Sequence, residues 1–91
     1  MKKSVMNKIT QTMVDKVLED AEIRDEKWWG NLTVVSVRLK NGWTITQTSA
    51  CVDPANYDHD LGVNICMKKI EDEIWKLLGW TLNDDMHGRL I

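Results

Sequence analysis

The feature that most restricts the fold is a pair of β-branched segments joined by Asn-Gly. Residues 32–39 (LTVVSVRL) and residues 43–50 (WTITQTSA) are rich in Val, Ile and Thr, which favour strands. Asn41 and Gly42 lie between them, and this dipeptide is typical of tight hairpin turns because both residues tolerate a positive φ. The sequence therefore predicts an antiparallel β-hairpin over residues 32–50.

The length of the hairpin loop decides which side chains share a face, since a shift of one residue moves every side chain to the other face. A two-residue loop separates Trp43 from the valines of the first strand. A three-residue loop over residues 40–42, with Gly42 in the left-handed conformation, brings the large apolar side chains together. We therefore predict the three-residue loop, with a buried face that comprises Val35, Val37, Leu39, Trp43 and Ile45. The predicted solvent face comprises Ser36, Arg38, Thr44, Thr46 and Thr48.

Helical patterns flank the hairpin on both sides. Before it, apolar side chains recur every three or four residues, which predicts an amphipathic helix over residues 7–20 with a stripe of Met6, Ile9, Met13, Val14, Val17 and Leu18. Residues 21–29 admit a short edge strand, ended by Gly30-Asn31. After the hairpin, Asp53-Pro54 predicts a single helical turn, because Asp caps free amides and Pro suits the first helical position.

A long helix is expected next, starting at Asp58 or Asp60. Its apolar stripe comprises Ile65, Cys66, Ile70, Ile74, Leu77 and Leu78. Trp75 is expected to anchor it in the core, and Gly79 is the predicted C-cap. Residues 80–82 are expected to return against this helix, and residues 83–91 to form a loose tail.

The fold class that follows is α+β, in one small domain over residues 1–91. It comprises an N-terminal helix, an antiparallel β-hairpin or three-stranded sheet, and a long C-terminal amphipathic helix. Because the chain holds five Trp, one Tyr and no Phe around a short open sheet, we expect self-association into at least a dimer.

Charge and composition exclude several function classes. The net charge of −2 disfavours a nucleic-acid binder, whose affinity comes mostly from clustered basic residues. No apolar run reaches the roughly 20 residues that a membrane span needs, so we expect a cytoplasmic protein. Cys51 and Cys66 do not form a CxxC motif.

The chemistry-bearing residues do not form a recognisable catalytic or metal motif. Ser49, Cys51 and His59 lack the sequence context of a nucleophile elbow or of a cysteine protease. The spacing of Asp58, Asp60 and Gly62 imitates part of a calcium loop but lacks its other ligands, so helix capping explains these acids better. We expect a protein that is not an enzyme and that needs neither a metal nor a cofactor.

A binding role stays open. Tyr57 in a loop and Trp43 at a turn offer aromatic rings, and the cations Arg38, Lys68, Lys69 and Arg89 offer partners for an anion. Aromatic stacking combined with Arg or Lys pairing is how nucleotides are commonly held. The alternative for all these residues is an ordinary solvated surface.

One segment resembles a known family. The resemblance rests on residues 33–35 (TVV), 39–43 (LKNGW), 49–58 (SACVDPANYD) and 79–82 (GWTL), together with Gly62, Ile65, Ile74, Trp75 and Leu77. These residues resemble the family of small phage proteins named after gene product forty-nine of phage N-four and gene sixty-six of phage Sf-six. The resemblance covers a core over residues 33–82, whereas residues 1–30 match little beyond a plausible leading helix.

The resemblance implies a function in the host cytoplasm. The family is similar to the phage anti-Thoeris proteins, which sequester immune signals of the cyclic ADP-ribose type in an oligomer. The resemblance implies a counter-defence protein whose loop at Asn56 and Tyr57 faces a cyclic nucleotide between subunits. From the cationic residues of the sequence itself, we expect Lys69 and Arg89 to contact the same ligand. The alternatives are a phage protein that binds and modulates a host protein, and an accessory protein of DNA metabolism.

Overall fold

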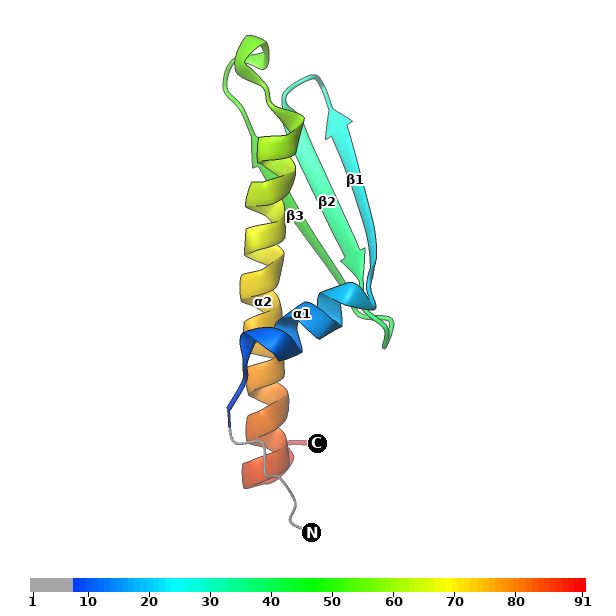
Figure 1. The fold of residues 1–91 in the computed structure, drawn as a ribbon, viewed down its shortest axis with the longest axis vertical. Coiled ribbons are helices and arrows are strands. Elements are labelled where there is room, and N and C mark those ends of the chain that lie inside the picture. The colour runs from blue at the N-terminus through cyan, green and yellow to red at the C-terminus, as the bar shows by residue number, and fades with distance from the viewer. Residues whose placement is uncertain (1–7) are drawn as a thin grey trace.

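A computed structural model describes residues 8–91 and shows one sheet packed on one long helix (Figure 1). The elements in chain order are α1 (Gln11–Glu19), β1 (Glu22–Trp28), β2 (Leu32–Arg38), β3 (Thr44–Ala50), the 3-10 helix η1 (Pro54–Asn56) and α2 (His59–His87). This order confirms the predicted α+β class, with the three-stranded sheet rather than the hairpin alone. No helix formed by residues 8–91 has the length and hydrophobicity needed to cross a membrane.

The hairpin adopts the register that the apolar pattern predicts. Strands β2 and β3 are antiparallel, and Val37 lies opposite Ile45. The amide of Leu39 donates to the carbonyl of Trp43 at 2.8 Å, so residues 40–42 form a three-residue loop. Gly42 has a φ of +92°, which lies in the left-handed region that glycine adopts more easily than residues with a side chain. Both the loop length and the glycine conformation are therefore confirmed.

Residues 22–28 form the edge strand that the sequence left open. β1 pairs with β2 in an antiparallel ladder from Glu22 opposite Arg38 to Trp28 opposite Leu32. The chain turns through residues 29–31, where Trp29 and Gly30 both have positive φ. Every residue of β1 is exposed, because α2 packs on β2 and β3 and leaves β1 uncovered.

The core lies between the helix-facing side of the sheet and α2. Its buried hydrophobic side chains are Val14 from α1, Val35 and Val37 from β2, Ile45 from β3, and Cys66, Ile70 and Ile74 from α2. The predicted buried face is thus confirmed at Val35, Val37 and Ile45, whereas Leu39 is only half-buried and Trp43 is 56% exposed. Figure 1 gives the reason: the β2–β3 turn lies away from α2, and α1 crosses the space between them. Trp75 is only half-buried at the edge of this core.

One close contact sets the spacing between α2 and the sheet. Gly62 in the first turns of α2 lies directly over Thr33 of β2, which is fully buried. A Cβ placed on Gly62 would overlap the Thr33 hydroxyl oxygen and lie 2.8 Å from the Thr33 Cβ, inside the closest distance that real atoms adopt. Glycine is therefore required here by the approach of the helix to the strand rather than by its backbone dihedrals.

The helices differ from prediction at two of their ends, the start of α1 and the end of α2. α1 begins at Gln11 behind an N-cap at Thr10, later than the predicted residue 7, and Met6 of the predicted stripe lies outside the described residues. The prediction that α2 ends at Gly79 is wrong. The predictions of a returning segment over residues 80–82 and of a loose tail from residue 83 are wrong as well. α2 continues to His87 and ends at Gly88, where φ is +99°. A glycine costs a helix only about 1 kcal/mol, and Leu82 prolongs the apolar stripe through it.

Candidate functional site

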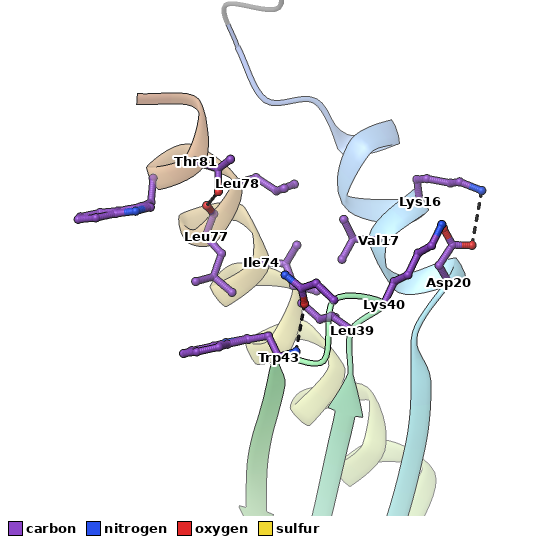
Figure 2. Close-up of a pocket in the computed structure, with 12 residues that line it drawn as sticks. Lys16, Val17, Asp20, Leu39, Lys40, Trp43, Ile74, Leu77, Leu78 and Thr81 are labelled. Carbon is purple, nitrogen blue, oxygen red and sulfur yellow. Dashed lines mark hydrogen bonds and ion pairs between the residues drawn. The ribbon is translucent and has the colours of Figure 1, made fainter. Parts of the chain in front are cut away.

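An apolar cleft opens where α1, the β2–β3 turn and the second half of α2 meet (Figure 2). Its volume is about 420 Å³. Apolar side chains from all three segments line it, and these are Val17, Leu39, Trp43, Ile74, Leu77, Leu78 and Trp80. The cleft exists because the three-residue turn holds Leu39 and Trp43 away from the helix while α1 bridges the remaining gap.

Two exposed indoles flank this cleft. Trp43 follows the turn, where its backbone amide donates to the Asn41 side-chain oxygen at 3.0 Å, and Figure 2 shows its ring on the same side of α2 as Leu77. Trp80 lies on α2 about one helical turn after Leu77, and its side chain is 60% exposed. Such large exposed rings beside an apolar hollow are typical of a surface that binds a ligand or another protein.

Charged side chains lie at the opposite rim of the cleft. Lys16 of α1 contacts Glu19 at 3.1 Å and Asp20 at 3.5 Å. The hydrogen bond to Glu19, followed by the charge of Asp20, raises the pKa of Lys16, which therefore stays protonated. Lys40 on the turn also lines the cleft, and the ion pairs among residues 8–91 do not include it. Lys40 is therefore the cation that a bound anion can reach most readily.

The loop predicted to face a nucleotide is built by two caps. Asp53 accepts from the amide of Ala55 at 2.9 Å, and Asp58 accepts from the amide of Leu61 at 3.1 Å, which confirms both capping predictions. Between them Asn56 is exposed and Tyr57 is half-buried. The Tyr57 hydroxyl is 2.6 Å from the Thr33 hydroxyl and 2.7 Å from Nδ1 of His59, so it is already bonded within the chain.

A small hollow of about 150 Å³ lies beside this loop. Asn56, Tyr57 and Asp58 line it, together with Thr33, Ser49, Ala50, Cys51, Leu61, Gly62 and Ile65. It is about one third the size of the apolar cleft and lies near the start of α2, whereas the cleft lies along the second half of that helix.

The remaining two predicted ligand residues lie elsewhere. Lys69 donates from Nζ to the Thr48 carbonyl at 2.9 Å, at the exposed edge of β3. Arg89 lies two residues after the end of α2, and its guanidinium is 3.9 Å from Asp85. The 29 residues of α2 span about 43 Å at 1.5 Å each, so this helix separates Arg89 from Asn56. One chain brings Asn56 and Tyr57 together but does not bring Arg89 to them.

A comparison with models of protein families found a match over most of the chain. The model of the Phage protein (N4 Gp49/phage Sf6 gene 66) family matches residues 3–86. The chain belongs to this family. No curated protein and no solved structure matches the chain.

The family match extends further than the resemblance seen in the sequence. It takes in α1, β1 and most of α2, so the family's pattern includes the leading helix that residues 33–82 alone did not reveal. The residues that line the cleft run from Lys16 to Thr81, so the whole cleft lies within the part of the chain that the N4 Gp49/Sf6 gene 66 family model matches.

The cleft is the site that reading the sequence missed. Its walls come from three segments, and the partial sequence signals were Trp43 at a turn and Trp80 beside a glycine. His59 was also missed as a structural partner: its Nε2 lies 2.7 Å from Oδ1 of Asp25, a residue 34 positions earlier in the chain. Neither association follows from spacing within one element.

Proposed function

We propose that this phage protein works by binding rather than by catalysis. Its proposed ligand is a nucleotide-type immune signal of the host, such as a cyclic nucleotide or a cyclic ADP-ribose isomer, which it sequesters in the host cytoplasm as a counter-defence. Membership of a phage protein family gives the setting. The resemblance to signal-sequestering phage proteins gives the ligand class, and the cleft gives the proposal its physical basis.

The observation that carries the proposal is the apolar cleft between two exposed indoles. A volume of about 420 Å³ lies within the range of roughly 300–1,000 Å³ typical of small-molecule sites. Trp43 offers a ring face on which a base can stack, and Lys40 offers a cation for a phosphate. An aromatic ring at one rim of the cleft and a cation at the other suit a planar, anionic ligand that spans the cleft.

The cleft supports this proposal better than the Tyr57 loop does. The hollow beside Tyr57 has only about 150 Å³, and the tyrosine hydroxyl is bonded to two groups of its own chain. Asp53 and Asp58 add negative charge at this loop. A contact of Asn56 or Tyr57 and Arg89 with one ligand requires two copies of the chain, because α2 separates them.

Self-association is part of the same proposal. The last turns of α2 extend past α1 and the sheet (Figure 1) and carry the exposed side chains of Trp80 and Met86. Leu90 and Ile91 follow them, also exposed. Apolar groups gathered at one end of a 91-residue chain are typical of a surface that a second copy covers.

The proposal is tested by thermal unfolding with candidate signals. Cyclic ADP-ribose, its glycosidic isomers and cyclic dinucleotides are each titrated over a range of concentrations. A ligand that binds stabilises the fold by about 2.7 kcal/mol once its concentration reaches about 100 times its dissociation constant. For a domain of this size that raises Tm by about 10–20 °C. Trp43→Ala is expected to weaken binding about five- to 150-fold, the effect of losing one stacked base.

Trp29→Ala is the matched control for that variant. Trp29 is 83% exposed at the β1–β2 turn, outside the cleft, so its loss should leave the affinity for the signal unchanged. If no ligand of this class raises Tm, or if Trp29→Ala and Trp43→Ala weaken binding equally, the proposed ligand site is wrong.

A second candidate function is direct binding of a host protein. The observation that favours it is the strongly apolar lining of the cleft, which suits an aliphatic or aromatic side chain of a partner. Such a protein ignores nucleotides and co-purifies with one host protein, and Trp43→Ala removes that partner. The net charge of −2 remains unfavourable for a third role in DNA metabolism, which predicts salt-sensitive binding to nucleic acid.

A further inference from the structure

A chain of three short hydrogen bonds joins four side chains at the start of α2. The Thr33 hydroxyl lies 2.6 Å from the Tyr57 hydroxyl, and that hydroxyl lies 2.7 Å from Nδ1 of His59. On the far side of the ring, Nε2 of His59 lies 2.7 Å from Oδ1 of Asp25. The chain therefore runs from a fully buried threonine on β2 to an exposed carboxylate on β1.

The two ends of the chain fix the direction in which its protons point. Asp25 ends it with a carboxylate, which accepts and does not donate, so Nε2 of His59 must carry a proton. Thr33 begins it with a buried hydroxyl, whose one hydrogen-bond partner among the described residues is Tyr57. If Thr33 donates to Tyr57, then Tyr57 donates to Nδ1 of His59, and every proton has an acceptor.

The opposite direction leaves a buried group unpaired. A proton on Nδ1 of His59 obliges Tyr57 to donate to Thr33 instead. The Thr33 proton then has no acceptor, and a buried hydroxyl without a partner is costly. Gly62 reinforces this, because α2 lies directly over Thr33 and closes that side of the hydroxyl to water. The arrangement that satisfies all four groups has a neutral His59 with its proton on Nε2.

The chain connects parts of the fold that otherwise have few contacts. β1 is exposed throughout, and α2 packs on β2 and β3 instead. Asp25 reaches His59 across this gap, and the ammonium of Lys27, also on β1, lies 5.5 Å from the centre of the Tyr57 ring. The Asn56–Tyr57 loop is thus held by β1, through Asp25 and Lys27, and by β2, through Thr33.

We propose that Asp25 and His59 are positioning residues that lock the Asn56–Tyr57 loop in one conformation through this directional chain. Tyr57 serves as the middle link of the chain, and its hydroxyl is committed to that role rather than to a ligand. The lock does not depend on what the apolar cleft binds, because the chain and the cleft lie at different ends of α2.

The tautomer of His59 tests the direction of the chain. In the wild-type protein near neutral pH, ¹⁵N NMR is expected to show a protonated Nε2 and an unprotonated Nδ1 on His59. His87 in the last turn of α2 is the internal reference, because its ring is exposed and makes no hydrogen bond with the described residues. A His59 spectrum that matches His87 overturns the proposal.

Hydrogen exchange tests the lock itself. Tyr57→Phe removes the middle link but keeps the ring, and Asp25→Ala removes the carboxylate. Each is expected to speed amide exchange over residues 51–58 by about tenfold, as expected for the loss of a hydrogen bond of this kind. Glu22→Ala is the matched control, since it removes an exposed carboxylate of β1 whose hydrogen bond is to Arg24.

Two outcomes of the exchange experiment contradict the proposal. One is exchange in Asp25→Ala no faster than in Glu22→Ala. The other is exchange over residues 51–58 in Tyr57→Phe that is no faster than in the wild type, which shows that the Tyr57 hydroxyl does not hold the loop. Circular dichroism of each variant establishes that the sheet and α2 are retained, and if Asp25→Ala loses them it is replaced by Asp25→Leu, which keeps the size of the side chain but offers no acceptor to His59.

Discussion

Replacing Gly62 with alanine is expected to separate α2 from the sheet at its closest point. The new Cβ would overlap the Thr33 hydroxyl oxygen and lie 2.8 Å from the Thr33 Cβ. Thr33 belongs to the central strand and is fully buried, so it cannot rotate away into solvent. Either the helix or the strand must move by about 1 Å for the two residues to reach ordinary contact.

The change in the free energy of unfolding is the sum of three contributions, two of them unfavourable and one favourable. Overpacking a close contact costs about 1–3 kcal/mol. Displacing Thr33 breaks its hydrogen bond with Tyr57 and leaves a buried hydroxyl unpaired, which costs about 1–3 kcal/mol more. Alanine is the better helix former by about 1 kcal/mol, which offsets part of this. These contributions sum to a net loss of about 1–5 kcal/mol, and its central value of about 3 kcal/mol lowers Tm by about 12–24 °C.

Gly79→Ala is the matched control in the same helix. A Cβ on Gly79 meets nothing within 4 Å, so this variant should gain the helix preference alone, up to about 1 kcal/mol. Thermal and urea unfolding of both variants measure the difference. Combining Gly62→Ala with Thr33→Ala should cost less than the two single changes together, since the nearest contact is then gone. Equal stability of Gly62→Ala and Gly79→Ala would refute the argument.

Three further predictions concern packing, assembly and the thiols. Trp75→Ala should cost about 2 kcal/mol, below the roughly 3–5 kcal/mol of a fully buried Trp because its side chain is only partly buried, as urea unfolding will show. Light scattering at high micromolar concentration should give a mass of at least twice 10.5 kDa, and Trp80→Glu should lower it; a wild-type monomer contradicts self-association. Burial raises the pKa of the Cys66 thiol, so the folded state holds this proton more tightly than the unfolded state and the resulting stability is lost as pH rises. A thiol reagent near neutral pH should therefore modify Cys51 first, and equal rates at both cysteines contradict this.

Local rules predicted the hairpin because every signal in it agrees. Asn41 and Gly42 set the turn, and the alternation of Val37 and Ile45 with polar residues sets the register. The capping acids Asp53 and Asp58 were equally predictable, since each acts on an amide two or three residues away. These features depend on interactions that are close in sequence.

The end of α2 was predicted wrongly because a glycine is a weak stop signal. Gly79 costs the helix little, and the apolar residues on both of its sides continue one stripe. The stop comes at Gly88 instead, where the backbone turns to positive φ. The exposure of Trp43 was also beyond sequence reasoning, because it depends on how far the β2–β3 turn lies from α2.

The candidate site could not be predicted because it joins distant segments. The cleft needs α1, the turn at residues 39–43 and α2 around Leu77 to meet. The hydrogen-bond chain needs Asp25 and His59 to face each other across strands and helix. The sequence indicated which aromatic and cationic residues could bind a ligand, but which of them lie together in the structure depends on tertiary packing alone.

The most direct test of the central claim is an NMR titration that follows the indole N–H resonances of the five Trp. Added cyclic ADP-ribose isomers or cyclic dinucleotides are expected to shift the resonances of Trp43 and Trp80, which line the cleft. The resonances of Trp28 and Trp29, at the opposite end of the sheet from the β2–β3 turn, should not move. A titration that leaves Trp43 and Trp80 unshifted at saturating ligand, or that shifts Trp28 and Trp29 instead, contradicts the account.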